Sequence, residues 1–140
     1  MGHAAGQAIT INNDLVFGAV LPGIPKTIAK TQAGSAAEFL INGTAGAEIT
    51  YVFALPTLLI ASGSSMQIIF TKTDAAVDNR TTPDQSLPQK NNLDAWHTIT
   101  DTLGINGSMI WLGGQVVPKL RQEQGSYSAS IVLTVTYTGG

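Results

Sequence analysis

The sequence contains no cysteine in its 140 residues. Disulfide bridges, thiol catalysis, zinc fingers and iron–sulfur clusters are therefore excluded, because all of them use cysteine. Charge is also scarce, since 11% of the residues are charged, compared with roughly 25% in ordinary soluble domains. The formal net charge is −2, and the seven basic residues are scattered along the chain. No nucleic-acid partner is expected from this distribution.

Long apolar runs are missing as well. No segment approaches the ~18 consecutive apolar residues of a membrane helix, so no membrane span is predicted. The first residues, "MGHAAGQ", lack the basic region and the apolar stretch of a signal peptide. Either the chain begins after a cleaved signal or the protein is not exported. Polarity carried mainly by Thr, Ser, Asn, Gln and Gly is common in secreted β proteins and favours the first reading.

Short alternating or apolar runs recur along the chain, and no segment shows a convincing helical period. The turn "NGTAG" (42–46) predicts a hairpin between the strand that holds Phe39 and the strand that holds Tyr51. We expect about seven to nine short strands separated by Gly, Pro and Asn turns. This pattern predicts an all-β fold, an antiparallel β-sandwich, with an immunoglobulin-like Greek key as the preferred version.

The chain is expected to consist of an N-terminal segment, residues 1–11, and a single sandwich domain, residues 12–140. A polar stretch without periodicity predicts a long loop at 72–95. Near the end of the chain, apolar and polar residues alternate, which predicts a strand with one face in the core. The predicted core residues of this strand are Tyr127, Ile131, Leu133, Val135 and Tyr137.

Catalytic chemistry has little support. The two histidines are His3, at the start of the chain, and His97, which has no partner motif nearby and is interpreted as a strand histidine. Glu38 and Glu48 flank the 42–46 turn, but we interpret them as the polar face of the hairpin rather than as a glycosidase pair. We therefore predict no catalytic residues and no enzyme activity.

Metal and cofactor sites are not predicted either. The stretch "DAAVD" (74–78) could offer oxygen atoms to calcium, but a solvated loop is the preferred interpretation. Three triplets match the N-glycosylation pattern, at Asn42, Asn79 and Asn106, and turn chemistry accounts for two of them. Of the two tryptophans, Trp111 reads as a buried strand residue, whereas Trp96 beside the polar loop is a candidate contact for a sugar ring.

Three segments resemble a family of bacterial secreted proteins, the domain of unknown function 4402. They are "AAEFLINGTAGAEITYVFALPTLLI", with glycines before a tyrosine and a "LP" pair, the ending "GSMIWLGGQVVPKLRQEQGSYSASIVLTVTYTGG", and the opening "ITINNDLVFGAV". They cover most of the chain in the right order. The segment 72–101 departs from the family, because it is longer and more polar.

The resemblance implies an exported, pilin-like β-sandwich at the bacterial cell surface, similar in style to fimbrial and spore-coat subunits. Such subunits have an incomplete fold and receive a strand from the next copy, which covers an open sheet edge. We therefore expect a structural subunit of a filament or coat whose partners are other copies of itself. The expected donated strand is Ala8, Ile9, Thr10 and Ile11.

Two other functions stay open. The first is a monomeric, surface-displayed module that binds a carbohydrate or a protein through the 72–95 loop and Trp96. The second is a virion decoration protein. Neither would need a cofactor.

Overall fold

The computed structural model describes residues 8–61 and 64–139, and in these ranges it contains only strands, turns and loops. All strand pairings in this part of the chain are antiparallel. The predicted all-β class is therefore confirmed. The strands are β1 (Ala8–Asn13), β2 (Leu15–Val20), β3 (Lys26–Ile28), β4 (Ala37–Asn42), β5 (Glu48–Ala54), β6 (Leu58–Ala61), β7 (Ser64–Ile69), β8 (Ala75–Asp78), β9 (Lys90–Leu93), β10 (Ile99–Thr102), β11 (Ser108–Leu112), β12 (Gly114–Val117), β13 (Gly125–Ala129) and β14 (Val132–Gly139).

These 14 strands exceed the expected seven to nine, because several extended stretches are interrupted midway. One interruption falls at Gly113, between β11 and β12. A Cβ atom at this position would lie 2.3 Å from the carbonyl oxygen of Ile28, so only glycine allows this approach. The same stretch therefore belongs to one sheet before Gly113 and to another sheet after it.

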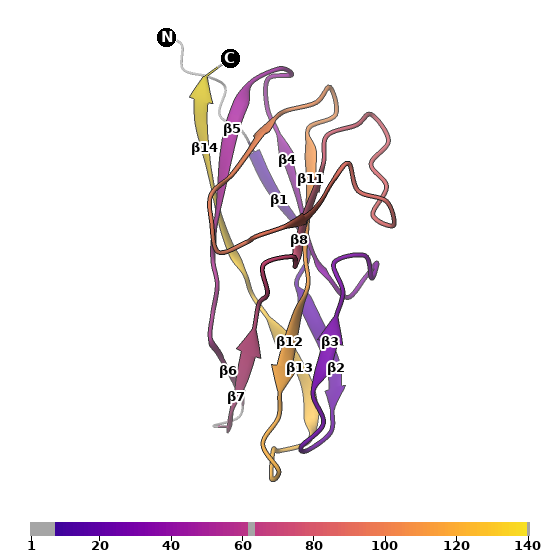
Figure 1. Cartoon of the computed structure of the whole chain (residues 1–140), viewed down its shortest axis with the longest axis vertical. Coiled ribbons are helices and arrows are strands. Elements are labelled where there is room, and N and C mark those ends of the chain that lie inside the picture. Colours follow the sequence, from indigo (N-terminus) through magenta and orange to yellow (C-terminus); the bar gives the residue numbers. More distant parts are fainter. Residues whose placement is uncertain (1–7, 62–63, 140) are drawn as a thin grey trace.

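The strands form four sheets, two in each half of an elongated molecule (Figure 1). The upper half holds the sheets β1-β4-β11-β8-β9 and β10-β5-β14. The lower half holds β3-β12-β7-β6 and β13-β2. Both β1 and β14 are edge strands of their sheets.

The core lies between these layers. In the upper half, Phe39 of β4 and Phe53 of β5 meet edge to face, with ring centroids 6.1 Å apart. In the lower half, a Cβ atom on Gly114 of β12 would lie within 3.2 Å of Leu15 of β2 and 2.9 Å of Phe70. One continuous cluster of buried apolar side chains links the two halves.

The predicted hairpin at 42–46 is wrong. β4 pairs with β1 and β11, whereas β5 pairs with β10 and β14, so the turn joins two layers. Each strand has one apolar face, and Phe39 and Phe53 bury these faces against each other instead of lying side by side. A glycine-rich turn permits either connection, so the turn alone does not fix the pairing.

The segment 72–95, expected to be a polar loop, contains β8 and β9. β8 lies between β11 and β9, and all four of its residues are buried. Its "AAV" run is too short to show a period of two, and polar residues surround it in the sequence. The rest of the segment contains no strand, and its longest part is the loop 79–89 between β8 and β9.

The last strand is also divided. Tyr127 lies in β13, Ile131 between the strands, and Leu133, Val135 and Tyr137 in β14. The first three side chains are buried, and the last two are partly buried against the core. The alternating pattern therefore runs across a change of sheet.

Candidate functional site

An apolar groove lies between the edge strands β1 and β14. Its volume is about 350 Å³. The lining combines aliphatic and aromatic side chains with Asp14 at the junction of β1 and β2. The full lining is Ile9, Ile11, Asp14, Phe39, Ser130, Ile131, Val132 and Leu133.

The register of β1 explains why this face is apolar. Ile9 lies opposite Ile41 and Ile11 opposite Phe39, and directly paired residues project from the same face of a sheet. Both isoleucines therefore point to the core side, yet they remain 41% and 60% exposed. They stay exposed because the facing sheet ends at β14 and does not extend over β1.

Side-chain hydrogen bonds of β1 gather at its C-terminal end. The Asn13 amide donates to the carbonyl oxygens of Gly34 and Ala36, at 2.8 Å and 2.9 Å. The Asn12 amide donates to Glu38, which also accepts a 2.8 Å bond from the Trp111 indole. The strand is thus anchored by side-chain hydrogen bonds at its junction with β2. Residues Ala8 to Ile11 are held instead by backbone hydrogen bonds to β4 and by apolar side chains that are only half covered.

The structure brings the two predicted sets of residues together. Ile9 and Ile11, from the expected donated strand, form one wall of the groove, and Ile131 and Leu133, from the expected core strand, form the other. Residues 1–7 of the N-terminal segment lie outside the described ranges. Sequence reasoning missed Phe39 as the groove floor and missed the groove itself, because the alternation of a strand does not reveal which strand stands at an edge.

Trp96 lies apart from the groove in the turn before β10. Its side chain is 49% exposed. The indole N–H donates to the carbonyl oxygen of Phe70 at 2.8 Å, and the two rings meet edge to face. Next to it, His97 lies 3.6 Å from Asp94 and is exposed. The indole therefore ties the turn to the residue that follows β7, and about half of Trp96 is exposed to solvent.

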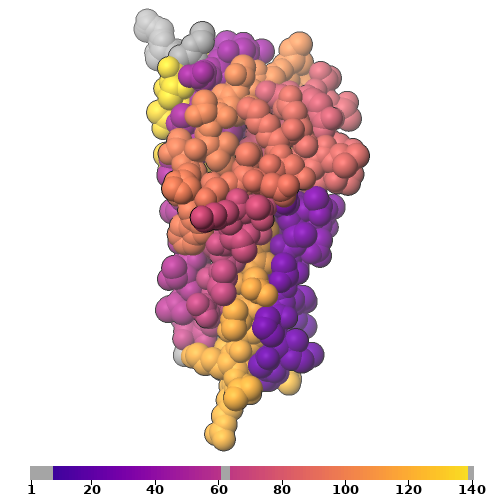
Figure 2. Space-filling view, in the orientation of Figure 1, coloured from indigo at the N-terminus to yellow at the C-terminus, as the bar shows by residue number. Residues whose placement is uncertain are grey.

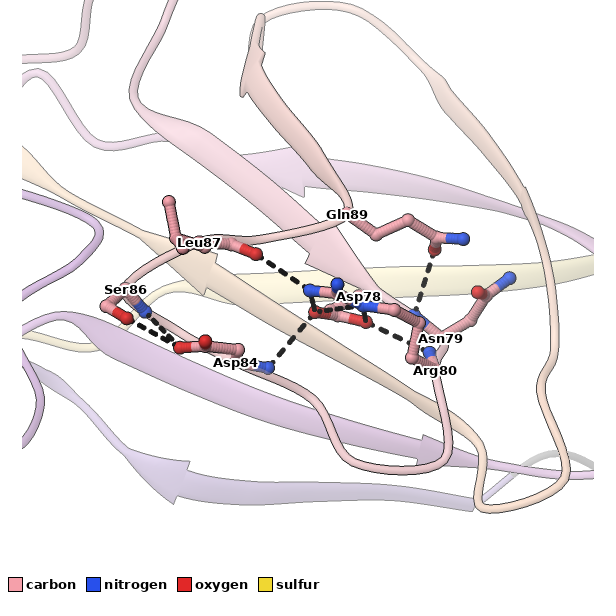
Figure 3. Close-up of polar contacts among 7 residues, drawn as sticks. All are labelled: Asp78, Asn79, Arg80, Asp84, Ser86, Leu87 and Gln89. Atoms are coloured by element: carbon pink, nitrogen blue, oxygen red, sulfur yellow. Dashed lines mark hydrogen bonds and ion pairs between the residues drawn. The ribbon is translucent and has the colours of Figure 1, made fainter.

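A charged cluster holds the 79–89 loop (Figure 3). The Asp78 carboxylate is buried at the end of β8 and accepts bonds from the Arg80 guanidinium and from the backbone N–H groups of Arg80 and Asp84. Burial raises the pKa of Asp78, but these donors outweigh burial and lower that pKa to about 2. Arg80 also donates to the carbonyl oxygen of Leu87. The cluster therefore fixes the loop as part of the fold.

A second polar cluster lies between the layers around Asp101. Lys90 of β9 donates to this carboxylate at 3.0 Å, and the hydroxyl of Ser108 lies 3.2 Å away. Tyr51 and Asn79 complete the set at 3.5 Å and 3.4 Å. Burial raises the pKa of Tyr51 above its usual range. These donors satisfy a buried carboxylate, which is the requirement of a structural ion pair.

Other candidate residues do not converge. Glu38 and Glu48 belong to different sheets, as β4 and β5 do. Asp74 accepts a hydrogen bond from the backbone N–H of Thr71, and Asp78 accepts the hydrogen bonds of the loop cluster. Within residues 8–61 and 64–139, no three acidic or histidine side chains gather as a metal site requires.

The glycosylation triplets occupy turns and strand ends. Asn42 and Asn106 are exposed, whereas Asn79 is partly buried and donates to the carbonyl oxygen of Thr102 at 2.6 Å. A glycan at Asn79 would replace one of the two amide hydrogens, and this amide donates to both Thr102 and Asp101.

Comparison of the chain with family models, with curated proteins and with solved structures finds no significant match. The resemblance stated from the sequence motifs therefore stays a prediction. In the part of the chain that the structure describes, no helix is long and apolar enough to cross a membrane.

Proposed function

We propose that the protein is a structural, non-catalytic subunit of a bacterial cell-surface filament or coat that assembles with copies of itself by strand complementation. The proposed fold is a pilin-like, immunoglobulin-like Greek-key sandwich, located outside the cell. The groove between β1 and β14 carries the proposal. It leaves two isoleucines of an edge strand half covered, beside a second edge strand.

In the proposed exchange, residues 8–11 leave β4 and the equivalent residues of a neighbour enter. With β1 gone, Phe39, Ile41 and Leu133 line a wider channel between β4 and β14. The incoming strand takes the position that β1 holds in the isolated chain, so further burial of its isoleucines comes from contacts with the second copy. Fully burying an isoleucine contributes ~1.5–3 kcal/mol. Because Ile9 and Ile11 are 41% and 60% exposed in the isolated chain, covering both with the second copy would add about half of that for each.

The backbone supports the exchange in a second way. Exchange of an identical strand preserves every ladder hydrogen bond and changes only which chain supplies it. When each copy gives its strand to the next and receives one from the previous copy, the contact is head to tail. A contact of this type grows an open filament unless its rotation closes a ring.

A reversible lock tests the proposal. Thr10 lies directly opposite Leu40 in the register of β1 and β4, and paired antiparallel residues are close enough for a disulfide. Because the chain has no cysteine of its own, T10C/L40C should form one defined bridge that holds β1 on its own β4. We expect the oxidised protein to stay monomeric and the reduced protein to assemble like the wild type.

Each single-cysteine variant serves as a control for the loss of the native side chain. Filaments from the oxidised double variant, at the wild-type rate, would refute the exchange. A wild-type chain that remains monomeric under all conditions would refute the structural role.

The second candidate function is a surface-displayed module that binds a carbohydrate or a protein. The observation in its favour is the exposed face of Trp96. Trp96→Ala should abolish glycan-array binding if this function holds, whereas a structural subunit shows no specific ligand in either form.

A further inference from the structure

A second surface stands apart from the groove, at the lower end of the molecule. It is formed by the turns 21–25 and 118–124, which we call the lower pole. The backbone N–H of Gly23 donates to the carbonyl oxygen of Lys119 at 2.8 Å, so the two turns are joined. Figure 2 shows the 118–124 turn projecting from this end.

Three large apolar side chains are exposed on this pole. Leu21 and Ile24 are each 56% exposed, and Leu120 is 88% exposed. Leu120 rests against the neighbouring turn, because a Cβ atom at Gly23 would lie 3.1 Å from its Cδ2 atom. Three exposed aliphatic residues on two adjoining turns form a patch rather than the scattered exposure usual for a surface.

The turn that carries Leu120 is held firmly. Gln122 is 3% exposed and donates from its side chain to Ser64 at 2.8 Å, while its side-chain oxygen accepts from the Lys119 backbone. The Tyr127 hydroxyl donates to the carbonyl oxygen of Glu123 at 2.7 Å. A surface fixed before contact loses little conformational entropy on binding. The exposed leucine is therefore presented in a defined position.

Charge distinguishes the two ends of the molecule. The strands and turns of the lower half carry three basic residues and one acidic residue, a net +2: Lys26, Lys119, Arg121 and Glu123. The strands of the upper half and the loops that join them carry six acidic and two basic residues, a net −4: Glu38, Glu48, Asp78, Asp84, Asp94, Asp101, Arg80 and Lys90. Both upper basic residues pair with buried carboxylates. Of the remaining acidic residues, Asp84 lies in the 79–89 loop and Glu48 directly follows the 43–47 turn. Glu38 and Asp94 lie farther from that end, Glu38 opposite Asn13 and Asp94 in the turn before β10.

The upper end also has exposed apolar residues beside its acidic ones. Its turns and loop, 43–47, 79–89 and 103–107, form what we call the upper pole. The Gly46 backbone donates to Leu103, and the Asn106 amide donates to Thr81, so these segments adjoin. Ile105 and Leu87 are 80% and 73% exposed there.

We propose that the lower pole docks on the upper pole of a second copy of this chain. Lys119 and Arg121, which flank the exposed Leu120, would then meet Asp84 and Glu48, which lie in or directly beside the segments of the upper pole, while Arg80 stays paired with Asp78. The two surfaces are complementary in charge, and both carry exposed aliphatic side chains. The two surfaces differ, so the contact is heterologous and propagates along the long axis. This inference rests on the proposed self-assembly but uses a contact separate from the exchanged strand.

Charge reversal at each pole tests the docking. The full-length chain is compared with K119E/R121E, with E48K/D84K and with L120S by sedimentation velocity, and circular dichroism confirms that each variant folds. Each change should weaken end-to-end association by about tenfold or more. An equal mixture of the two charge-reversed variants should recover association, since the lower pole of one then complements the upper pole of the other. K72E, away from both poles, should associate like the wild type.

Three results would overturn the docking. The first is association unchanged by L120S and by both reversals, and the second is a mixture that fails to recover association. The third is wild-type flotation with phosphatidylcholine–phosphatidylglycerol vesicles that is lost in L120S while self-association stays unchanged. That result would assign the pole to a lipid surface.

The strand lock separates this inference from the proposed function. If oxidised T10C/L40C assembles like the wild type while the pole variants fail, strand exchange is wrong and the docking stands. If the lock blocks assembly and the pole variants assemble normally, the docking is wrong and strand exchange stands.

Discussion

Removal of the Lys90 ammonium should destabilise the fold more than the removal of a surface charge that has no buried partner. The ammonium lies 3.0 Å from the Asp101 carboxylate, whose side chain has no exposed surface, while the Lys90 side chain is 44% exposed. At this distance the attraction is about 5–6 kcal/mol for an effective dielectric constant of about 20. Lys90→Met would leave the carboxylate buried without a cation.

The expected loss is smaller than the gross attraction. Water reaches the half-exposed ammonium and screens it, and Ser108, Tyr51 and Asn79 remain as hydrogen-bond donors to the carboxylate. Removal of one partner of a buried pair costs about 3–5 kcal/mol. With screening, we expect about 2–3 kcal/mol for Lys90→Met, a large share of the ~5–15 kcal/mol that stabilises a typical domain.

Urea unfolding followed by circular dichroism and tryptophan fluorescence measures the difference. Lys30→Met is the matched control, because Lys30 donates to the carbonyl oxygen of Thr73 and to Asn92 without a carboxylate partner. We expect less than about 1 kcal/mol for this control. The double variant K90M/D101N, which removes both charges, should be more stable than the sum of the single changes predicts.

A Lys90→Met protein as stable as Lys30→Met would refute the reasoning. It would mean that the three remaining donors alone stabilise the buried carboxylate.

Two further predictions concern the loop cluster and one glycine. Because the pKa of Asp78 is lowered from 3.8 to about 2 in the folded protein, its contribution is complete above about pH 4 and is lost as the pH falls toward 2. At pH 7, the free energy of unfolding of D78N should be lower than that of the wild type by up to about 2 kcal/mol. In urea titrations between pH 5 and pH 2, D78N should lose less of its free energy of unfolding than the wild type does. Identical pH dependence of the two proteins would contradict this. Gly107→Ala should cost about 3 kcal/mol or more, because the new Cβ would lie 2.1 Å from the carbonyl oxygen of Ile41 at a φ of +84°. Gly125→Ala, where nothing lies within 4 Å, is its control, and equal melting temperatures for the two variants would contradict the packing argument.

The fold class could be predicted because it depends on local patterns. Alternation in residues 127–137 and in 37–41 indicates strands with one apolar face, and these strands are present. Pairing could not be predicted in the same way. The turn 42–46 permits a hairpin or a connection between layers, and the choice depends on the contact between Phe39 and Phe53.

The interruptions of the strands could not be predicted from the sequence either. Gly113 reads as an ordinary turn glycine, and its role appears only when Ile28 approaches it from another sheet. The short buried strand Ala75–Asp78 shows no alternation, because both of its faces are covered.

For the candidate site, too, the local strand pattern could be predicted and the arrangement in space could not. Ile9, Ile11, Ile131 and Leu133 were recognisable as the apolar sides of two strands at opposite ends of the chain. Their proximity was not recognisable, because it depends on which strands stand at the edges of the sheets. The lower pole is another case, since the turns that carry Leu21 and Leu120 are far apart in the sequence and are joined by the hydrogen bond between Gly23 and Lys119.

The most direct test of strand exchange uses two different single-cysteine chains. T10C and L40C are mixed during assembly and then oxidised, with T10C and Q67C as the control mixture, because Gln67 lies on β7 in the lower half. The account predicts disulfide-linked pairs of T10C and L40C chains in the assembled fraction and none in the control. Filaments that form without this cross-link would contradict the account.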